Sequence, residues 1–440
     1  MRKLFLIAAG LLAILPGQAL SAPSVAERRM IATVDSEQPR TIAMLQSWVD
    51  TNSGTLNLTG VERVGTMLRT ELEPLGFTVE WVDMKAAGRA GHIIARHRGS
   101  RQGKRLLLIG HLDTVFEADS PFQRWVREGD KGHGPGAGDD KGGMAVIVAA
   151  LRAMDKAGAL KRSNIIVFLT GDEEDAGNPL AISRRDLVAE GRKADLALDF
   201  EGMVQENGMD IGSIARRSAG SWTVTVTGKS GHSSGVGGNA GFGANFELAR
   251  IIYSFRRELP EPSLTFNVGL IGGGERMTVD PGKIRLEANG KTNIIAATAF
   301  ARGDMRALSK EQIDRVQARM RAIVAEPLAG AAATISFDPD SYPPMPPTAG
   351  SRAILAQLNA VNRDLGLPEM GELDPIKRGA GDISFVAQDV NGLIGLGPAS
   401  WGDHTPGETV DIPSIAKQAK RAAILMSRLA AQRRDPKAQR

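Results

Sequence analysis

Four short apolar runs, each followed closely by a histidine or an acidic residue, constrain the fold of this chain more than any other feature. The runs cover residues 105–109, 164–169, 196–200 and 392–396. Their length and apolar character are typical of strands buried on both faces of a parallel sheet. Stretches with helical spacing accompany them at residues 144–157, 351–365 and 415–431. Strands that alternate with helices predict an α/β domain with a mostly parallel sheet and helices on both faces.

The middle of the chain follows a different pattern. Polar and apolar residues alternate, as in half-exposed antiparallel strands, at residues 221–227, 283–288, 293–305 and 333–337. Helical stretches lie between them at residues 244–258 and 310–326. This order predicts an α+β domain at residues 219–340, inserted between two parts of the main domain at residues 23–218 and 341–432. A proline-rich segment, residues 342–347, marks the return to the main domain.

The two ends of the chain are predicted to lie outside the fold. Arg2 and Lys3 precede an apolar run at residues 4–15 and a group of small residues, which is the pattern of a secretory signal peptide. A membrane anchor is the less favoured alternative, because the run is too short to span a bilayer comfortably. We therefore expect residues 1–22 to be removed on export to the periplasm, with no membrane attachment afterwards. Residues 433–440 form a polar tail.

The composition limits both ligands and partners. The chain contains no cysteine, so disulfides cannot stabilise it, and any tightly bound metal must be held by His, Asp and Glu. Its formal net charge is only +4, and aromatic side chains on which bases could stack are few, with 2 Tyr and 13 Phe. With no basic stripe interleaved with aromatic residues, binding of nucleic acid is not expected.

Five potential metal ligands lie where predicted strands end or a predicted helix begins. In open α/β sheets, ligands bind beyond the carboxyl ends of the strands. The candidates that follow the four strands are His111, Glu174, Glu201 and His404. The fifth, Asp139, lies in a glycine-rich segment, residues 134–143, whose glycines allow the backbone to turn tightly and approach a ligand.

Each candidate alone has an ordinary structural explanation. A histidine after a strand is more often structural, and an acidic pair such as Glu173-Glu174 is more often part of a solvated loop. Their convergence favours a metal site, because carboxylates brought together without a cation repel one another. Imidazole and carboxylate ligands suit zinc, and also manganese or cobalt. Five such ligands suit two metals that share a bridging carboxylate, with Glu173 as the general base that moves the proton of the attacking water.

Other kinds of catalytic site find little support. The segment 134–143 lacks the Gly-Lys-Ser/Thr ending of a phosphate-binding loop, and Asp139 and Asp140 would repel phosphate. No serine lies in a nucleophile elbow, and the chain has no thiol. A metal-dependent hydrolase is therefore the favoured class.

The motifs of this site resemble those of one family of hydrolases. They are Gly110-His111-Leu112-Asp113-Thr114, Asp139-Asp140-Lys141-Gly142-Gly143, Thr170-Gly171-Asp172-Glu173-Glu174, Phe200-Glu201, Gly228-Lys229-Ser230-Gly231-His232-Ser233, Asn293-Ile294-Ile295 and Asp403-His404-Thr405. In this order they resemble the co-catalytic di-zinc peptidases. That family includes glutamate carboxypeptidase of the carboxypeptidase G type, acetylornithine deacetylase, succinyl-diaminopimelate desuccinylase and related dipeptidases.

The resemblance implies two Zn²⁺ ions per chain, with Co²⁺ or Mn²⁺ as possible substitutes. It implies that His111 and Glu201 bind one ion, that Glu174 and His404 bind the other, and that Asp139 bridges the two.

The resemblance also implies roles for residues around the metals. Asp113 would orient His111, a cis peptide bond would follow Asp139, and Glu173 matches the general base. The inserted domain would be a lid and a dimerisation domain in a homodimer. His232 would reach the active site of the other subunit and stabilise the oxyanion.

The substrate is less closely defined. Glu201 favours the glutamate carboxypeptidase branch, because other branches often have Asp there, and the resemblance suggests Asn293 and an arginine for the substrate carboxylate. No arginine lies near residues 338–340, where the family pattern places one, so Arg306 and Arg378 are the substitutes. We expect release of a C-terminal amino acid such as glutamate from a small peptide or N-acyl amino acid. An aminopeptidase, dipeptidase or N-acyl amino acid deacylase with the same metals is the alternative, and a non-catalytic binding protein a remote one.

Overall fold

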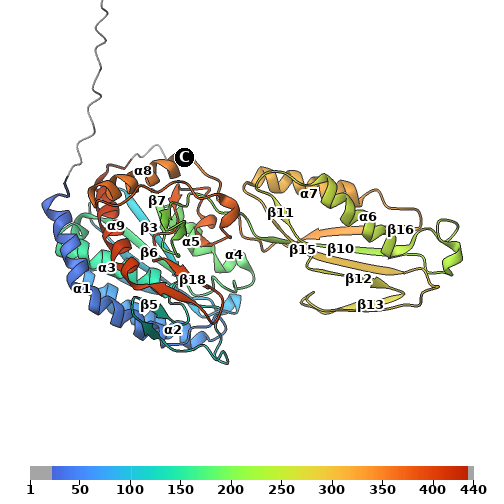
Figure 1. Ribbon diagram of the computed structural model, residues 1–440, viewed down its shortest axis with the longest axis horizontal. Coiled ribbons are helices and arrows are strands. Elements are labelled where there is room, and N and C mark those ends of the chain that lie inside the picture. Colours follow the sequence, from blue (N-terminus) through green and yellow to red (C-terminus); the bar gives the residue numbers. More distant parts are fainter. Residues whose placement is uncertain (1–21, 101, 435–440) are drawn as a thin grey trace, which may run out of the picture.

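The computed structural model describes residues 22–100 and 102–434, which form two lobes (Figure 1). The larger lobe contains a six-stranded sheet. Its strands, in spatial order, are β1 (Thr78–Asp83), β2 (Gly91–His97), β6 (Asn164–Thr170), β3 (Arg105–His111), β7 (Leu196–Asp199) and β17 (Gly392–Leu393). The last four are parallel to one another, and β1 and β2 form an antiparallel edge. The predicted mostly parallel sheet is confirmed, and the antiparallel edge is an addition to the prediction.

The last predicted strand, residues 392–396, is shorter than expected. Only Gly392–Leu393 pairs with β7. Gly395 has a φ of 82°, a left-handed conformation that glycine adopts readily and that turns the backbone out of the strand. The Leu396 amide still donates to the Asp199 carbonyl, so the chain stays close to the sheet beyond the turn.

Helices cover both faces of this sheet, as predicted. One face packs against α1 (Val25–Val49), α2 (Leu58–Leu72), α3 (Lys141–Lys156), α8 (Ala349–Asp364) and α9 (Ile412–Ala431). The other face packs against α5 (Arg185–Gly191) and the short helical turn Asp382–Phe385. In β3, Leu106 and Leu108 enter the first core, and Leu107 and Ile109 enter the second. This burial on both sides explains why the strand is a continuous apolar run.

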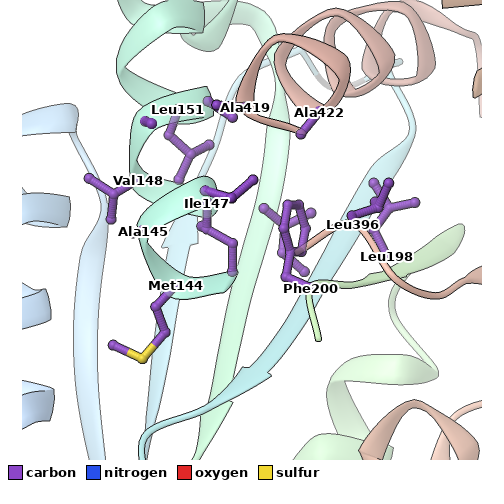
Figure 2. Close-up of a cluster of buried hydrophobic side chains, with 14 of the residues drawn as sticks. Met144, Ala145, Ile147, Val148, Leu151, Leu198, Phe200, Leu396, Ala419 and Ala422 are labelled. Carbon is purple, nitrogen blue, oxygen red and sulfur yellow. The ribbon is translucent and has the colours of Figure 1, made fainter. Parts of the chain in front are cut away.

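The core fixes the helix that begins at the candidate site. Figure 2 shows Ile147 and Leu151 of α3 in one cluster with Leu198 and Phe200, beneath α9. All four side chains are fully buried. Because a protein interior packs at crystal-like density, the N-terminus of α3 has little freedom to move relative to the strand ends.

The smaller lobe has the α+β composition expected for the middle of the chain. Its antiparallel sheet contains β10 (Gly220–Gly228), β11 (Thr265–Phe266), β12 (Leu270–Gly274), β15 (Thr298–Arg306) and β16 (Ala331–Phe337), and α6 (Gly243–Glu258) and α7 (Lys310–Val324) cover one face (Figure 1). Trp222, Val224 and Val226 point from β10 into a separate core, where the rings of Trp222 and Phe255 meet edge-on at 5.6 Å. These elements lie within residues 219–340. The use of this lobe as a lid and dimerisation domain stays a prediction.

Two predicted strands of this lobe begin later than expected. The stretch 283–288 is a strand only in its second half, because the Asp280 carboxylate accepts backbone amides of the turn that precedes it. The stretch 293–305 is a strand only from Thr298, because its first residues pair with the loop 231–233 instead. The shortened strand from the first of these stretches is β14 (Leu286–Asn289), which forms a hairpin with β13 (Arg276–Val279).

Small elements complete the larger lobe. They are α4 (Leu180–Ser183), the hairpin of β8 (Val204–Glu206) and β9 (Met209–Ile211), and a four-stranded sheet of β18 (Ser400–Trp401), β19 (Thr409–Asp411), β5 (Lys131–His133) and β4 (Val126–Glu128). Within the described part of the chain, every helix is too short or too polar to cross a membrane. The predicted signal peptide lies outside the described residues apart from Ala22, and so does the predicted tail beyond residue 434.

Candidate metal centre

Side chains from four separate segments meet beyond the carboxyl ends of the parallel strands. The segments are the end of β3 with His111, the loop after β6 with Glu174, the loop before α3 with Asp139, and the loop between β18 and β19 with His404. His111 Nε2 lies 3.0 Å from Asp139 Oδ1. His404 Nε2 lies 3.3 Å from Asp139 Oδ2 and 3.1 Å from Glu174 Oε2. Potential ligand atoms of His111, Asp139 and Glu174 all lie within 4.8 Å of one another, so Asp139 stands between the two histidines.

A buried carboxylate holds the loop that carries Asp139. Glu408, which is 1% exposed, accepts three backbone amides from residues 136–139 at distances between 2.8 and 3.2 Å. The next side chain, Asp140, accepts the backbone amide of His111 at 3.2 Å and so ties this loop to β3. The peptide bond between Asp139 and Asp140 is cis, as the family resemblance implies.

Asp113 lies behind the cluster and connects two of its segments. His111 Nδ1 lies 3.1 Å from the Asp113 backbone carbonyl and 3.4 Å from its carboxylate. This carboxylate is fully buried and accepts the Thr55 hydroxyl at 2.7 Å. The same carboxylate accepts the backbone amides of Glu173 and Glu174, at 3.0 and 3.1 Å. From this position one residue can orient both a candidate histidine ligand and the acidic loop beside it.

Glu173 lies on that acidic loop, next to Glu174. Its backbone is held on both sides, because its amide donates to Asp113 and its carbonyl accepts the phenol of Tyr342 at 3.0 Å. Burial, together with the negative charge of Glu201, raises the pKa of Glu173 well above its usual value. A carboxyl group with a raised pKa can exchange a proton near neutral pH, as a general base must.

A buried network that the sequence did not reveal supports this loop from behind. Arg184 donates to Asp172 at 2.5 Å, to Asp382 at 2.7 Å and to the Tyr342 hydroxyl at 2.7 Å. Asp382 in turn accepts the Thr170 hydroxyl at 2.5 Å. In the sequence, Arg184 is indistinguishable from a surface arginine beside Arg185, because the partners that bury it come from distant segments.

Glu201, the fifth predicted ligand, contacts two arginine side chains. Arg216 donates through Nη2 to Glu201 Oε2, and Arg378 Nη2 lies 3.6 Å from the same oxygen. Among the described residues, Glu201 has its ion pairs with these two arginines and none with His111 or His404. The structure thus brings four of the five candidate ligands into contact, and places the fifth beside Arg378, a candidate for substrate binding.

Two of the predicted residues lie in the smaller lobe, away from this cluster. His232 and Asn293 are both exposed and belong to paired loops, in which the Ser233 amide donates to the Asn293 carbonyl at 2.9 Å. Within the described chain, neither contacts the residues of the cluster. Arg306, at the end of β15, forms an ion pair with Asp304 at 3.0 Å and has no contact with the cluster either.

Neighbouring carboxylates raise the pKa of both histidines of the cluster. Burial lowers the pKa of His111, but hydrogen bonds to Asp113 and Asp139 outweigh burial and raise it well above its usual value. Hydrogen bonds to Asp139 and Glu174 raise the pKa of His404 to about 11. The carboxylates therefore favour a positive charge at this point, which either protonated rings or a bound cation would supply. The potential ligand atoms are two imidazole nitrogens and several carboxylate oxygens, with no thiolate among them. This set fits a divalent metal such as zinc, manganese or cobalt.

Metal binding is expected to strengthen as the pH rises. The protons on His111 and His404 must leave before the ring nitrogens can bind a metal, and the neighbouring carboxylates raise the pKa of both rings, that of His404 to about 11. The apparent association constant should therefore rise about tenfold per pH unit for each proton released. Competition with a chelating indicator at several pH values measures this slope.

Two histidine variants show which residues release the protons. His404→Gln should lower the slope of the logarithm of the association constant against pH by about one, because one fewer proton is displaced. His97→Gln is the control, since His97 lies on β2 and its ring bonds to the Ser163 carbonyl. An affinity that does not change with pH would contradict this protonation scheme.

The fold and the site together define a class of protein. A mostly parallel sheet with histidines and carboxylates gathered beyond its strand ends is the arrangement of a metal-dependent hydrolase. The chain belongs to peptidase family M20/M25/M40, whose model matches residues 107–428, and it is a metallopeptidase. The family and the fold class expected from the motifs are thereby confirmed.

Individual relatives agree with this assignment. The chain is 28% identical to carboxypeptidase G2 of Pseudomonas sp. (strain RS-16) over 434 residues. The aligned region covers 95% of this chain and 97% of that protein. The structure of aminopeptidase PepT from Bacillus cereus has the same fold, with a TM-score of 0.70 and 18% identity, over 89% of this chain and 99% of that one. The YXEP protein of Bacillus subtilis, a dinuclear metal binding peptidase from the M20 family, matches with a TM-score of 0.62 and 16% identity, over 90% and 99% of the two chains.

Proposed function

We propose that this protein is a carboxypeptidase-type amidohydrolase that releases a C-terminal amino acid such as glutamate from peptides or N-acyl amino acids. The observation that carries the proposal is the convergence of His111, Asp139, Glu174 and His404 around one volume, with Glu173 on the adjoining loop. The similarity to carboxypeptidase G2 along almost the whole chain supports the choice of substrate.

The proposed metal ligands follow from this geometry and from the family pattern. Asp139, which lies between the two histidines, is proposed to bridge two Zn²⁺ ions, with His111 and Glu201 on one side and Glu174 and His404 on the other. Both arginine partners of Glu201 contact its Oε2 atom, which leaves Oε1 free for a metal. Bound metals supply Lewis acidity toward the scissile carbonyl and lower the pKa of water, and Co²⁺ or Mn²⁺ are possible substitutes.

Glu173 is proposed to take the proton from the attacking water and to pass it to the leaving amine. Its raised pKa suits both halves of this transfer, because the group must first accept the proton and then release it. Asp113 is proposed to keep the Glu173 loop and the His111 ring in register through its three contacts with them.

Arg378 is proposed to bind the carboxylate of the substrate. Its side chain is 10% exposed and borders a cavity of about 180 Å³ that Trp401 and Asp403 also line. A guanidinium group can meet a carboxylate through two parallel hydrogen bonds, which suits a substrate with a free C-terminus. Arg306 and Asn293 are further candidates for this contact.

Export and assembly complete the proposal. We propose that residues 1–22 direct the chain to the periplasm. We also propose that the smaller lobe forms a homodimer in which His232 of the partner subunit stabilises the oxyanion. N-terminal sequencing of the mature protein and its mass in solution test these two statements separately.

The activity is tested with three sets of substrates: N-acyl-glutamates, folate-like compounds that end in glutamate, and free dipeptides. We expect cleavage of the N-blocked substrates, its loss after metal removal by a chelator, and its return when Zn²⁺ is added. Activity that survives complete metal removal would overturn the proposal. Cleavage of free-amine substrates alone would indicate an aminopeptidase or dipeptidase, and binding without turnover a non-catalytic protein.

A further inference from the structure

Two chain segments that pair with each other connect the two lobes. Arg216 pairs with Met345, and Ala219 pairs with Tyr342, in antiparallel fashion. Each pair exchanges two backbone hydrogen bonds, of 2.9 to 3.1 Å. We call these segments, residues 216–219 and 342–345, the connecting ribbon. Each strand of the ribbon carries one side chain into the candidate site.

Arg216 reaches from the outgoing strand to Glu201. Its side chain is 2% exposed. Nη2 donates to Glu201 Oε2 and lies 3.4 Å from Asp199, while Nη1 donates to the carbonyls of Gly379 and Ala380. These contacts fix the plane of the guanidinium group, and with it the orientation of the Glu201 carboxylate.

Tyr342 reaches from the returning strand to the loop of Glu173. Its hydroxyl donates to the Glu173 carbonyl at 3.0 Å and accepts a hydrogen bond from Arg184 at 2.7 Å. Its ring meets Phe385 edge-on, with centroids 4.9 Å apart. The tyrosine is thus held by its backbone in the ribbon and by its ring in the core, and its hydroxyl is fixed against the loop.

We propose that the connecting ribbon sets the geometry of the active site through Arg216 and Tyr342. Arg216 is a positioning residue for Glu201, and Tyr342 is a positioning residue for Glu173. The inference rests on the proposed function, which assigns Glu201 to a metal and Glu173 to proton transfer. Because both residues belong to the ribbon, the orientation of the smaller lobe and the geometry of the site are mechanically linked.

The first experiment separates position from charge at Arg216. Arg216→Lys keeps the positive charge, but an ammonium group cannot reach Glu201, Asp199 and the two carbonyls at once. Loss of an outer partner of a ligand typically weakens metal binding by roughly 10- to 100-fold. We expect an effect of this size on Zn²⁺ affinity, measured by competition with a chelating indicator.

Arg217→Lys is the matched control, since it makes the same change one residue along the ribbon. Arg217 is also buried, at 7% exposure, but it donates to Thr265 and to the Ile376 carbonyl, away from the candidate ligands. Its Zn²⁺ affinity should equal that of the wild type.

The second experiment removes one hydroxyl at the other strand. Tyr342→Phe should leave Zn²⁺ affinity unchanged and lower kcat by about tenfold with little change in KM, because it loosens the loop that places the proton-transfer group. The chain has one other tyrosine, Tyr253, which lies 60% exposed on α6. Tyr253→Phe should leave both kinetic constants unchanged.

The outcomes distinguish this inference from the proposed function. Wild-type protein that takes up no metal would overturn the proposed function, and the inference with it. If the wild type binds Zn²⁺ and Arg216→Lys binds it equally well, the inference alone is overturned. The same holds if Arg217→Lys loses as much Zn²⁺ affinity as Arg216→Lys. If Arg216→Lys does not fold, the kcat of Tyr342→Phe decides, and an unchanged kcat overturns the inference.

Discussion

Replacing Glu173 with Gln should abolish most turnover while the metals stay bound. The amide has nearly the shape of the carboxyl group, but it cannot take a proton from water. Loss of a general base costs about 10²- to 10⁴-fold in rate, and we expect kcat to fall within that range. Zn²⁺ content is expected to stay at the wild-type level, because Glu174 and the other candidate ligands are untouched. Steady-state kinetics and metal analysis of the same preparation measure the two effects together.

A surface glutamate provides the control for this variant. Glu62 is exposed on α2, and Glu62→Gln should leave rate and metal content as they are in the wild type. If Glu173→Gln keeps a rate close to that of the wild type, Glu173 has no part in proton transfer. If it loses metal instead, Glu173 acts as a ligand and the assignment of the two adjacent glutamates must be exchanged.

Replacing Asp139 with Asn should remove both the metals and the activity. Asp139 faces His111 with one oxygen and His404 with the other, so a neutral amide weakens both proposed metal positions at once. Loss of a partner behind the ligands already costs roughly 10- to 100-fold in metal affinity, so loss of the bridging ligand should exceed this range. We expect kcat/KM to fall by more than about 10³-fold, with metal content measured on the same sample.

Asp155, near the end of α3, is the matched control, since it is exposed and lies on the helix that follows the Asp139 loop. Asp155→Asn should keep the full metal content and rate. An Asp139→Asn protein that retains two metal ions per chain would remove Asp139 from the bridging position. A single retained ion would indicate that the two proposed positions are independent of each other.

The strand ends could be predicted because their residues lie next to long apolar runs. His111 and Glu174 each follow a strand that is buried on both faces, and such strands are recognisable without knowledge of their partners. The carboxyl ends of parallel strands meet at one edge of the sheet, so their proximity follows from the fold class. His404 was harder to place, because its preceding run leaves the sheet at Gly395 and its loop belongs to a small separate sheet.

The residues behind the site could not be predicted in this way. Arg216, Arg184 and Glu408 are of charged types that usually lie on the surface, and no local pattern marks them as buried. Their partners come from segments brought together only by the complete fold. The antiparallel edge of the sheet was missed for a related reason, since β1 is largely exposed and its alternation is irregular.

The contact between Glu408 and the Asp139 loop has a consequence for the newly made protein. The two parts lie on either side of the smaller lobe in the sequence, and the loop takes its shape from a side chain 272 residues beyond Gly136. His404 belongs to the same later part of the chain, so this part supplies one candidate ligand and the side chain that shapes the loop of another. Neither part of the larger lobe can therefore build the cluster alone, and its geometry depends on long-range closure of the chain during folding.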